Sequence, residues 1–267
     1  MTTLLLLSMG VGAIAGMLGG LLGLGGGIVI VPLLDWIFHA QGMEPDMAMH
    51  LALGTSLSSI VFTYSSSLVA HQRRGSVLWN LSLTVIPFLV VGTLLGSFLA
   101  ARLSTLPLKL LFSVFLLLMA RRFAFPPKRG PETAPKTWGK PALRLAGTGI
   151  GCLSALVGIG GGSLSVPLLL RAGATMTQAA GTSSSMGLPI ALGGAVGYVV
   201  NGLGAPGLPE HALGYVHLPA LAGIAAVSVC TAPVGVALAH RLPTSALKRI
   251  FSVLLLAGAA KMVLSVL

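Results

Sequence analysis

The sequence predicts an all-α polytopic membrane protein built from two homologous halves. Composition is the first observation: 55% of the 267 residues are hydrophobic and only 8% are charged. A soluble domain carries about 25% charged residues, so charge this scarce cannot cover a globular surface. The second observation is that apolar runs of about 20 residues, long enough to cross the hydrocarbon core, recur along the chain. The third is an internal repeat.

Three blocks of sequence occur twice in the same order, which indicates a tandem duplication. The first block reads GLGGGIVIVPLL and returns as GIGGGSLSVPLL, and the second reads LGTSLSS and returns as AGTSSSM. The third is a longer run that ends in FSV in both copies. The pairs are Gly23–Leu34 with Gly158–Leu169, Leu53–Ser59 with Ala180–Met186, and Gly96–Val114 with Gly235–Val253.

A polar stretch rich in Pro, Lys and Arg separates the copies. We expect a first transmembrane repeat over 1–123, a basic linker over 124–141 and a second repeat over 142–267. Five apolar segments are expected in each repeat: about 3–19, 26–40, 47–70, 77–101 and 106–123, then about 142–157, 163–172, 176–200, 212–239 and 245–266. The second segment of each repeat is too short to cross a bilayer about 30 Å thick. The first two segments of each repeat therefore form either one Gly-broken helix or a re-entrant hairpin.

The distribution of basic residues predicts the topology. Seven Lys and Arg lie in or beside the linker, which places the linker in the cytoplasm by the positive-inside rule. A hairpin at the start of the second repeat also puts Arg241, Lys248 and Arg249 inside. Equivalent loops of the two repeats then face opposite sides, which predicts an inverted repeat. Arg102 and Lys109 fall outside in this arrangement, against the rule.

The glycine-rich breaks predict a binding site. Non-helical backbone at membrane depth is tolerated where it lines a cavity, and glycine lets backbone approach a ligand closely. Each break precedes a short helix whose first amides carry partial positive charge, which suits a small anion. The expected substrate contacts are the amides of Gly25, Gly26, Gly27, Gly160, Gly161 and Gly162. The helix-break positions are Gly23, Pro32, Gly158 and Pro167, whereas Gly16, Gly19 and Gly20 are expected to pack helices together.

Two hydroxyl clusters follow a glycine at equivalent points of the third segments. Their first members are Thr55 and Ser56 in one repeat and Thr182 and Ser183 in the other. Hydroxyls donate hydrogen bonds without carrying charge, so they can bind an anion and still release it. We expect these four side chains to complete the anion site, although hydrogen bonding within or between membrane helices would explain them as well.

Few titratable residues are expected inside the membrane. Asp35 is the one acid outside the loops and His50 begins a long apolar segment, so both are candidate coupling residues for protons. For Asp35 an interfacial position is the alternative, and for His50 a hydrogen bond at a helix end. We expect no metal site and no cofactor, because the histidines and cysteines form no ligand-like cluster. The net charge of +11 comes mostly from Lys and Arg between the apolar runs, where such charges set the membrane topology. We therefore expect membrane lipid, and not nucleic acid, as the partner of this basic chain.

The paired motifs resemble those of the TauE/SafE sulfite exporter family. Each repeat of that family opens with G-x-G-G-G-x-x-x-x-P and continues to a G-T-S stretch. Here these are Gly23–Pro32 with Gly54–Ser56, and Gly158–Pro167 with Gly181–Ser183. The resemblance covers nearly the whole chain and leaves out only the linker. It implies export of sulfite, an organosulfonate such as sulfoacetate, or another small sulfur compound, across the bacterial inner membrane.

The residues themselves are compatible with two kinds of anion pathway. A secondary transporter would rock its two halves around the breaks and draw energy from a gradient, since the chain has no ATP-binding motif. A passive anion channel could use the same donors along a continuous pore. An intramembrane enzyme is disfavoured, because no catalytic pair of side chains is evident within the spans.

Overall fold

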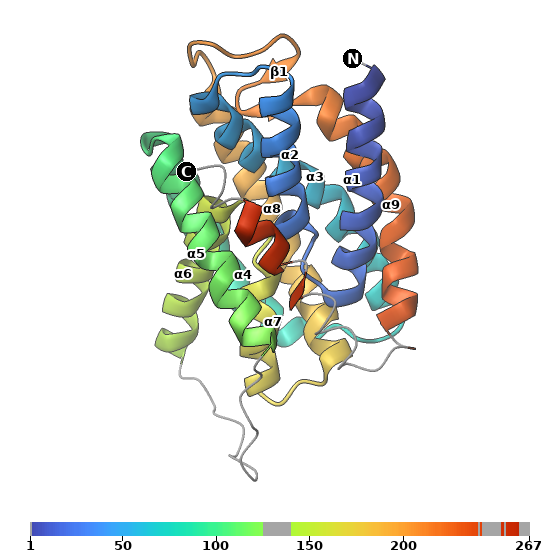
Figure 1. Cartoon of the computed structure of the whole chain (residues 1–267). Helices are drawn as coiled ribbons and strands as arrows, with labels where there is room; N and C mark the ends of the chain where they lie inside the picture. Colours follow the sequence, from blue (N-terminus) through green and yellow to red (C-terminus); the bar gives the residue numbers. More distant parts are fainter. Residues whose placement is uncertain (1, 125–139, 240, 242–251, 254, 262–267) are drawn as a thin grey trace.

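The computed structural model describes residues 2–124, 140–239, 241, 252–253 and 255–261 (Figure 1). These residues are almost wholly helical, which confirms the all-α class. The elements are α1 Thr2–Leu22, α2 Gly27–Ala40, α3 Pro45–Gln72, α4 Trp79–Arg102, α5 Thr105–Ala124, α6 Lys140–Val157, α7 Gly162–Arg171, α8 Met176–Gly202, β1 Ala212–Leu213, β2 Val216–His217 and α9 Leu218–Ala239. The segment expected over 245–266 lies largely outside the described residues.

One expected helix is shorter than its apolar run. The sequence predicts a helix from residue 212, but 212–217 form the antiparallel hairpin of β1 and β2, and α9 starts at Leu218. The hairpin turns through Gly214, which has a φ of 54°. Glycine adopts this left-handed conformation without the penalty of a Cβ, so the local turn overrides the apolar pattern.

The first two helices of each repeat fold back on one another. A Cβ added to Gly26, which precedes α2, would lie 2.5 Å from the carbonyl oxygen of Ala15 in α1. In the second repeat, a Cβ added to Gly161 would lie 3.1 Å from the hydroxyl of Ser154 in α6. The start of each short helix therefore lies beside the preceding helix. Of the two arrangements expected from the sequence, the structure has the hairpin and not the single broken helix.

The two repeats exchange packing partners. The first helix of each repeat lies against the fourth helix of the other, so α1 packs on α9 and α6 on α4. A Cβ on Gly16 would lie 2.6 Å from the Cα of Ser228, and Gly20 directly faces the carbonyl of Ala232. Such contacts are possible only between small residues, which confirms the packing role expected for Gly16 and Gly20. Gly92, Gly96 and Gly151 make similar contacts between α4 and α6.

The long helices α3 and α8 occupy the interior and carry the hydroxyl clusters. They pack on each other, and α3 also contacts α2 and α9. Of the most apolar stretch of α3, 83% of the residues are buried. Both G-T-S stretches are thereby brought to the centre of the molecule, next to the glycine breaks.

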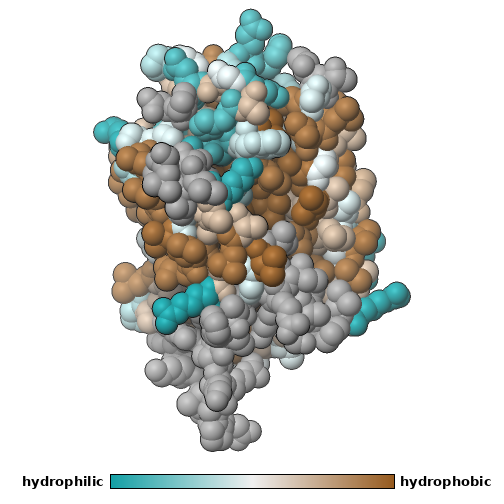
Figure 2. Space-filling model, viewed as in Figure 1, coloured by the Kyte–Doolittle hydropathy of each residue, from teal (hydrophilic) through white to brown (hydrophobic). Residues whose placement is uncertain are grey.

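The outer surface is suited to lipid. Within the part of the chain that the structure describes, five helices are long and apolar enough to cross a membrane: α1, α3, α4, α8 and α9. Figure 2 shows hydrophobic residues over much of the middle of the molecule, with hydrophilic residues at the top and a few at the lower edge. Large apolar side chains such as Leu83, Val196 and Val200 are exposed on these helices. In water this surface would drive aggregation, whereas in a bilayer it is the expected lipid contact.

Candidate functional site

Both breaks use glycine where the backbone requires it. Gly23 and Gly158, which end the first helix of each pair, have φ values of 68° and 66°. Gly26 and Gly161, which immediately precede the short helices, have φ values of 84° and 74°. An L side chain is strained in this left-handed region. The matching angles show that the repeated sequence produces the same local turn twice. Pro32 and Pro167 follow within the second turn of their helices.

The two breaks lie in direct contact, and the contact is reciprocal. A Cβ on Gly27 would lie 2.7 Å from the carbonyl oxygen of Gly158. In the same way Gly162, the counterpart of Gly27, directly faces the carbonyl of Gly23, the counterpart of Gly158. A side chain at either position would push the breaks apart. The structure therefore brings both predicted glycine clusters together in one buried region.

The two predicted serines cross-link the repeats at this point. The hydroxyl of Ser56 donates to the carbonyl oxygen of Gly158 at 2.8 Å, and the hydroxyl of Ser183 donates to that of Gly23, also at 2.8 Å. Both side chains are fully buried. A hydroxyl has a single hydrogen to donate. In this conformation both serines therefore stabilise the breaks, and their protons are committed to backbone carbonyls.

The two predicted threonines accept hydrogen bonds from the other repeat. The backbone amide of His217, directly before α9, donates to the Thr55 hydroxyl at 2.9 Å. The amide of Leu78, directly before α4, donates to the Thr182 hydroxyl, again at 2.9 Å. Each threonine thus satisfies an amide at the start of a helix, where intrahelical partners are missing. Accepting a bond leaves the hydroxyl hydrogen of each threonine available for another acceptor.

The helix starts supply the backbone donors. In α2 the amides of Val29 and Ile30 both donate to the carbonyl of Gly26, and in α7 those of Leu164 and Ser165 both donate to that of Gly161. The first two amides of each helix have no acceptor within it. These amides are those of Gly27, Ile28, Gly162 and Ser163. Of the predicted donors, the amide of Gly161 is already used, since it donates to the carbonyl of Ile159 at 2.8 Å.

Tyr64, on α3, fills the space between the breaks and was not expected from the sequence. Its hydroxyl donates to the carbonyl oxygen of Gly160 at 2.9 Å and also interacts with the backbone of Gly162. The ring lies so close to Gly25, Gly160 and Gly187 that a Cβ on any of them would overlap it. A single tyrosine among the hydroxyl residues of an expected membrane helix gives no specific sequence signal. Its importance follows from the three glycines that make room for it.

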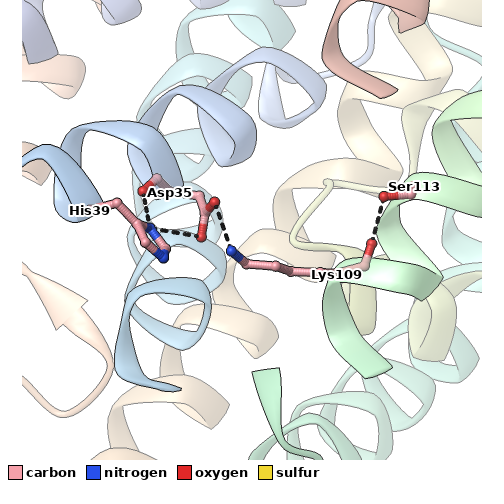
Figure 3. A network of polar contacts seen from close by, with 4 residues as sticks. All are labelled: Asp35, His39, Lys109 and Ser113. Carbon is pink, nitrogen blue, oxygen red and sulfur yellow. Dashed lines mark hydrogen bonds and ion pairs between the residues drawn. The ribbon is translucent and has the colours of Figure 1, made fainter. Parts of the chain in front are cut away.

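The candidate coupling residue Asp35 is buried in an ion pair (Figure 3). Its Oδ2 lies 3.3 Å from the Nζ of Lys109 on α5, and both side chains are 5% exposed. His39, one turn along α2, has its Nδ1 2.6 Å from the backbone oxygen of Asp35 and 3.6 Å from Oδ1. Lys109 is therefore no free loop charge. Its charge is paired with Asp35 inside the molecule, so Lys109 is a poor indicator of which side its loop faces.

The second candidate coupling residue, His50, ties two helices together. Its Nε2 lies 3.2 Å from the carbonyl oxygen of Ala100 and 3.1 Å from that of Leu103, at the end of α4. Its ring also lies 5.1 Å from that of Tyr215. A side chain that bonds the last carbonyls of a helix stabilises its C-terminus. His50 is thus a hydrogen-bonded residue at a helix end.

Five potential spans around two buried, touching helix breaks define an integral membrane protein of the polytopic helical class. The chain belongs to the sulfite exporter TauE/SafE family, whose model matches residues 8–262. It is accordingly a membrane transporter of the TauE/SafE type.

Relatives from distant organisms support this class. A "Probable membrane transporter protein" of Haemophilus influenzae is 34% identical over 264 residues, which cover 99% of this chain and 100% of that protein. A protein of the same description from Bacillus subtilis is 28% identical over 87% of this chain and 89% of its own length. One from Methanocaldococcus jannaschii is 31% identical over 71% of this chain and 70% of its own. No solved structure matches the chain.

Proposed function

We propose that the protein is a secondary transporter that exports a small sulfur-containing anion, such as sulfite or an organosulfonate, and has no enzymatic activity. The observation that carries the proposal is the reciprocal contact of the two helix breaks, which gathers the first amides of α2 and α7 in one buried region. Helix N-termini favour negative charge. The substrate class is supported by the family description, which names sulfite export.

Neutral donors suit a transported anion better than charged ones. The proposed contacts are the glycine amides of residues 25–27, 160 and 162, with the hydroxyls of Thr55, Ser56, Thr182 and Ser183; the amide of Gly161 is left out because it donates to Ile159. A lysine or arginine at the same point would bind the anion more strongly and slow its release. Because the serine hydroxyls bond to the carbonyls of Gly23 and Gly158 here, they reach the anion only after the breaks have shifted.

The proposed mechanism is alternating access by an inverted repeat. Four hydrogen bonds between the repeats support it, since the Ser56 and Ser183 bonds form one equivalent pair and the Thr55 and Thr182 bonds another. In Figure 1, α1 begins near the end of the molecule that carries β1, whereas α7 lies toward the opposite end. Rocking one repeat against the other would expose the breaks to each side in turn.

A proton gradient is the proposed energy source. Asp35 is the best candidate coupling residue, because a buried carboxylate that pairs with Lys109 can exchange its ionic partner for a proton. His50 is the weaker candidate, since its ring already bonds the end of α4. The basic linker is placed on the cytoplasmic side of the inner membrane, as its charge indicates.

Flux into proteoliposomes tests the proposal. The purified protein is reconstituted, and uptake of radiolabelled sulfite or sulfoacetate is followed with and without an imposed pH gradient. Accumulation above the external concentration that collapses with the pH gradient supports a coupled transporter. Movement only down the electrochemical gradient identifies a channel. Uptake no faster than in empty liposomes for either anion contradicts the proposed substrate class.

A further inference from the structure

The two breaks have the same backbone but different side chains. The second break is surrounded by serines where the first has apolar residues or glycine. Ser154, Ser163 and Ser165 of the second repeat correspond to Gly19, Ile28 and Ile30 of the first. The three serine side chains are 2%, 0% and 1% exposed. Among the described residues, buried serine hydroxyls without a partner therefore lie beside the second break, before and within α7, and not beside the first.

These serine hydroxyls are buried without satisfying a partner. None of the three has a hydrogen-bond partner among the residues that the structure describes. A buried hydroxyl left unpaired destabilises the folded protein, because it has lost its hydrogen bonds to water and gained none. Such groups are rare in native proteins and call for an explanation. A ligand that accepts their hydrogen bonds is the explanation that also accounts for their position beside the break.

Two of the hydroxyls lie at the start of α7. The Oγ of Ser154 lies 3.1 Å from the position of a Cβ on Gly161, the residue before the helix. Ser163 is the second residue of α7, where the backbone amide has no intrahelical acceptor. The amide of Gly162 lies between them in the chain. The residues at this helix N-terminus therefore carry two unpaired hydroxyls and one amide without an intrahelical acceptor.

An oxygen atom already occupies this helix start. The hydroxyl of Tyr64 interacts with the backbone of Gly162 while it donates to the carbonyl of Gly160. The residue equivalent to Tyr64 in the second repeat is Ala191, whose methyl side chain has no hydroxyl to place at the start of α2. The break with the unpaired serines, between α6 and α7, is thus also the one that the Tyr64 hydroxyl contacts.

We propose that the break between α6 and α7 is the oxyanion-binding side of the site, and that Tyr64 occupies it when the substrate is absent. The Ser154 and Ser163 hydroxyls and the Gly162 amide bind the three oxygens of a sulfite or sulfonate group, which displaces the Tyr64 hydroxyl. The break between α1 and α2 packs against this site and moves with it, but supplies no side-chain donor to the anion. This assignment rests on the proposed function and narrows its site to one of the two breaks.

Alanine substitutions in the full-length protein test the assignment, because binding and stability change in opposite directions. Ser154→Ala and Ser163→Ala each remove a donor to a charged ligand, and we expect KM for sulfite and sulfoacetate to rise about tenfold or more. Each also removes an unpaired buried hydroxyl, so the anion-free protein should melt at a higher temperature. Tyr64→Phe keeps the ring but frees the helix start, and should lower KM.

Ser8→Ala is the matched control. Ser8 in α1 is also fully buried with no hydrogen-bond partner among the described residues, but it lies at the opposite end of its helix from the break. This variant should melt at a higher temperature with KM unchanged. The assignment is overturned if neither Ser154→Ala nor Ser163→Ala alters KM, or if both lower the melting temperature of the anion-free protein.

A separate binding measurement distinguishes failure of this subsite from failure of the transport proposal. The melting temperature of the wild type is recorded with sulfite, sulfate and methanesulfonate. Stabilisation by sulfite or methanesulfonate that is lost in Ser163→Ala supports the subsite even if no flux is detected. Flux with normal KM in the serine variants, or no stabilisation of the wild type by any of the three anions, refutes the subsite.

Discussion

Replacing Lys109 by alanine should strongly destabilise the protein. The substitution leaves the Asp35 carboxylate, 5% exposed, without the ammonium group that lies 3.3 Å from it (Figure 3). Breaking a buried ion pair by removing one partner typically costs 3–5 kcal/mol, because an uncompensated charge stays buried. His39 at 3.6 Å from Oδ1, and the attraction of Lys261, offset part of this cost. We therefore expect a loss near 3 kcal/mol, which lowers the melting temperature by roughly 6–12 °C.

The assay is thermal unfolding of the detergent-purified protein, followed by circular dichroism. The double variant Asp35→Asn with Lys109→Met removes both charges and should recover most of the loss, because replacing both members of a buried pair is often neutral. A shift below 2 °C in Lys109→Ala would show that the pair is not buried as described. Failure of the double variant to recover stability would show that the charge is not the cause.

Three further predictions concern packing, the breaks and pH. Gly20→Leu should lower the melting temperature by several degrees, because a side chain there separates α1 from α9, whereas Gly10→Leu, whose position has open space around it, should not. Ser183→Ala should lower the free energy of unfolding by about 0.6–1.7 kcal/mol, because it leaves the carbonyl of Gly23 unpaired. The same unfolding assay measures this loss. The control Ser58→Ala loses only a bond within its own helix and should cost less. Burial, and secondarily the charge of His211, lower the pKa of His217 below its ordinary value, so stability should be constant above about pH 6.5 and fall at lower pH. A His217→Gln variant should flatten that dependence, and a wild-type melting temperature constant from pH 7.5 to 5 would contradict it.

The duplication made much of the fold predictable. Because the two copies of the glycine-rich motif had to form equivalent structures, the sequence indicated equivalent breaks, and the structure has matching angles at Gly26 and Gly161. The short length of the second segments limited them to two arrangements, and the loop charges favoured the hairpin that is observed. The packing glycines followed from a spacing typical of membrane helices.

The contacts between distant residues could not be predicted in the same way. Asp35 and Lys109 have no pattern that links them, and only the tertiary fold brings the side chain of Lys109 on α5 to Asp35 on α2. Tyr64 belongs to an apolar run, where an aromatic residue is most often simple core. The serines of α7 lie inside the repeated motif, and nothing in the motif marks them as ligands. Only the structure shows that their hydroxyls are buried without hydrogen-bond partners among the described residues. Each of these features depends on the neighbouring helix rather than on local sequence.

The most direct test of the proposed anion site is a structure of the protein with a bound anion whose anomalous scattering identifies it. Selenite in place of sulfite is such an anion. We expect a single strong peak within hydrogen-bond distance of the Gly162 amide and the Ser154 and Ser163 hydroxyls, with the Tyr64 hydroxyl displaced. A peak away from both glycine breaks would contradict the proposed site, and a peak at the start of α2 alone would contradict its assignment to the second break.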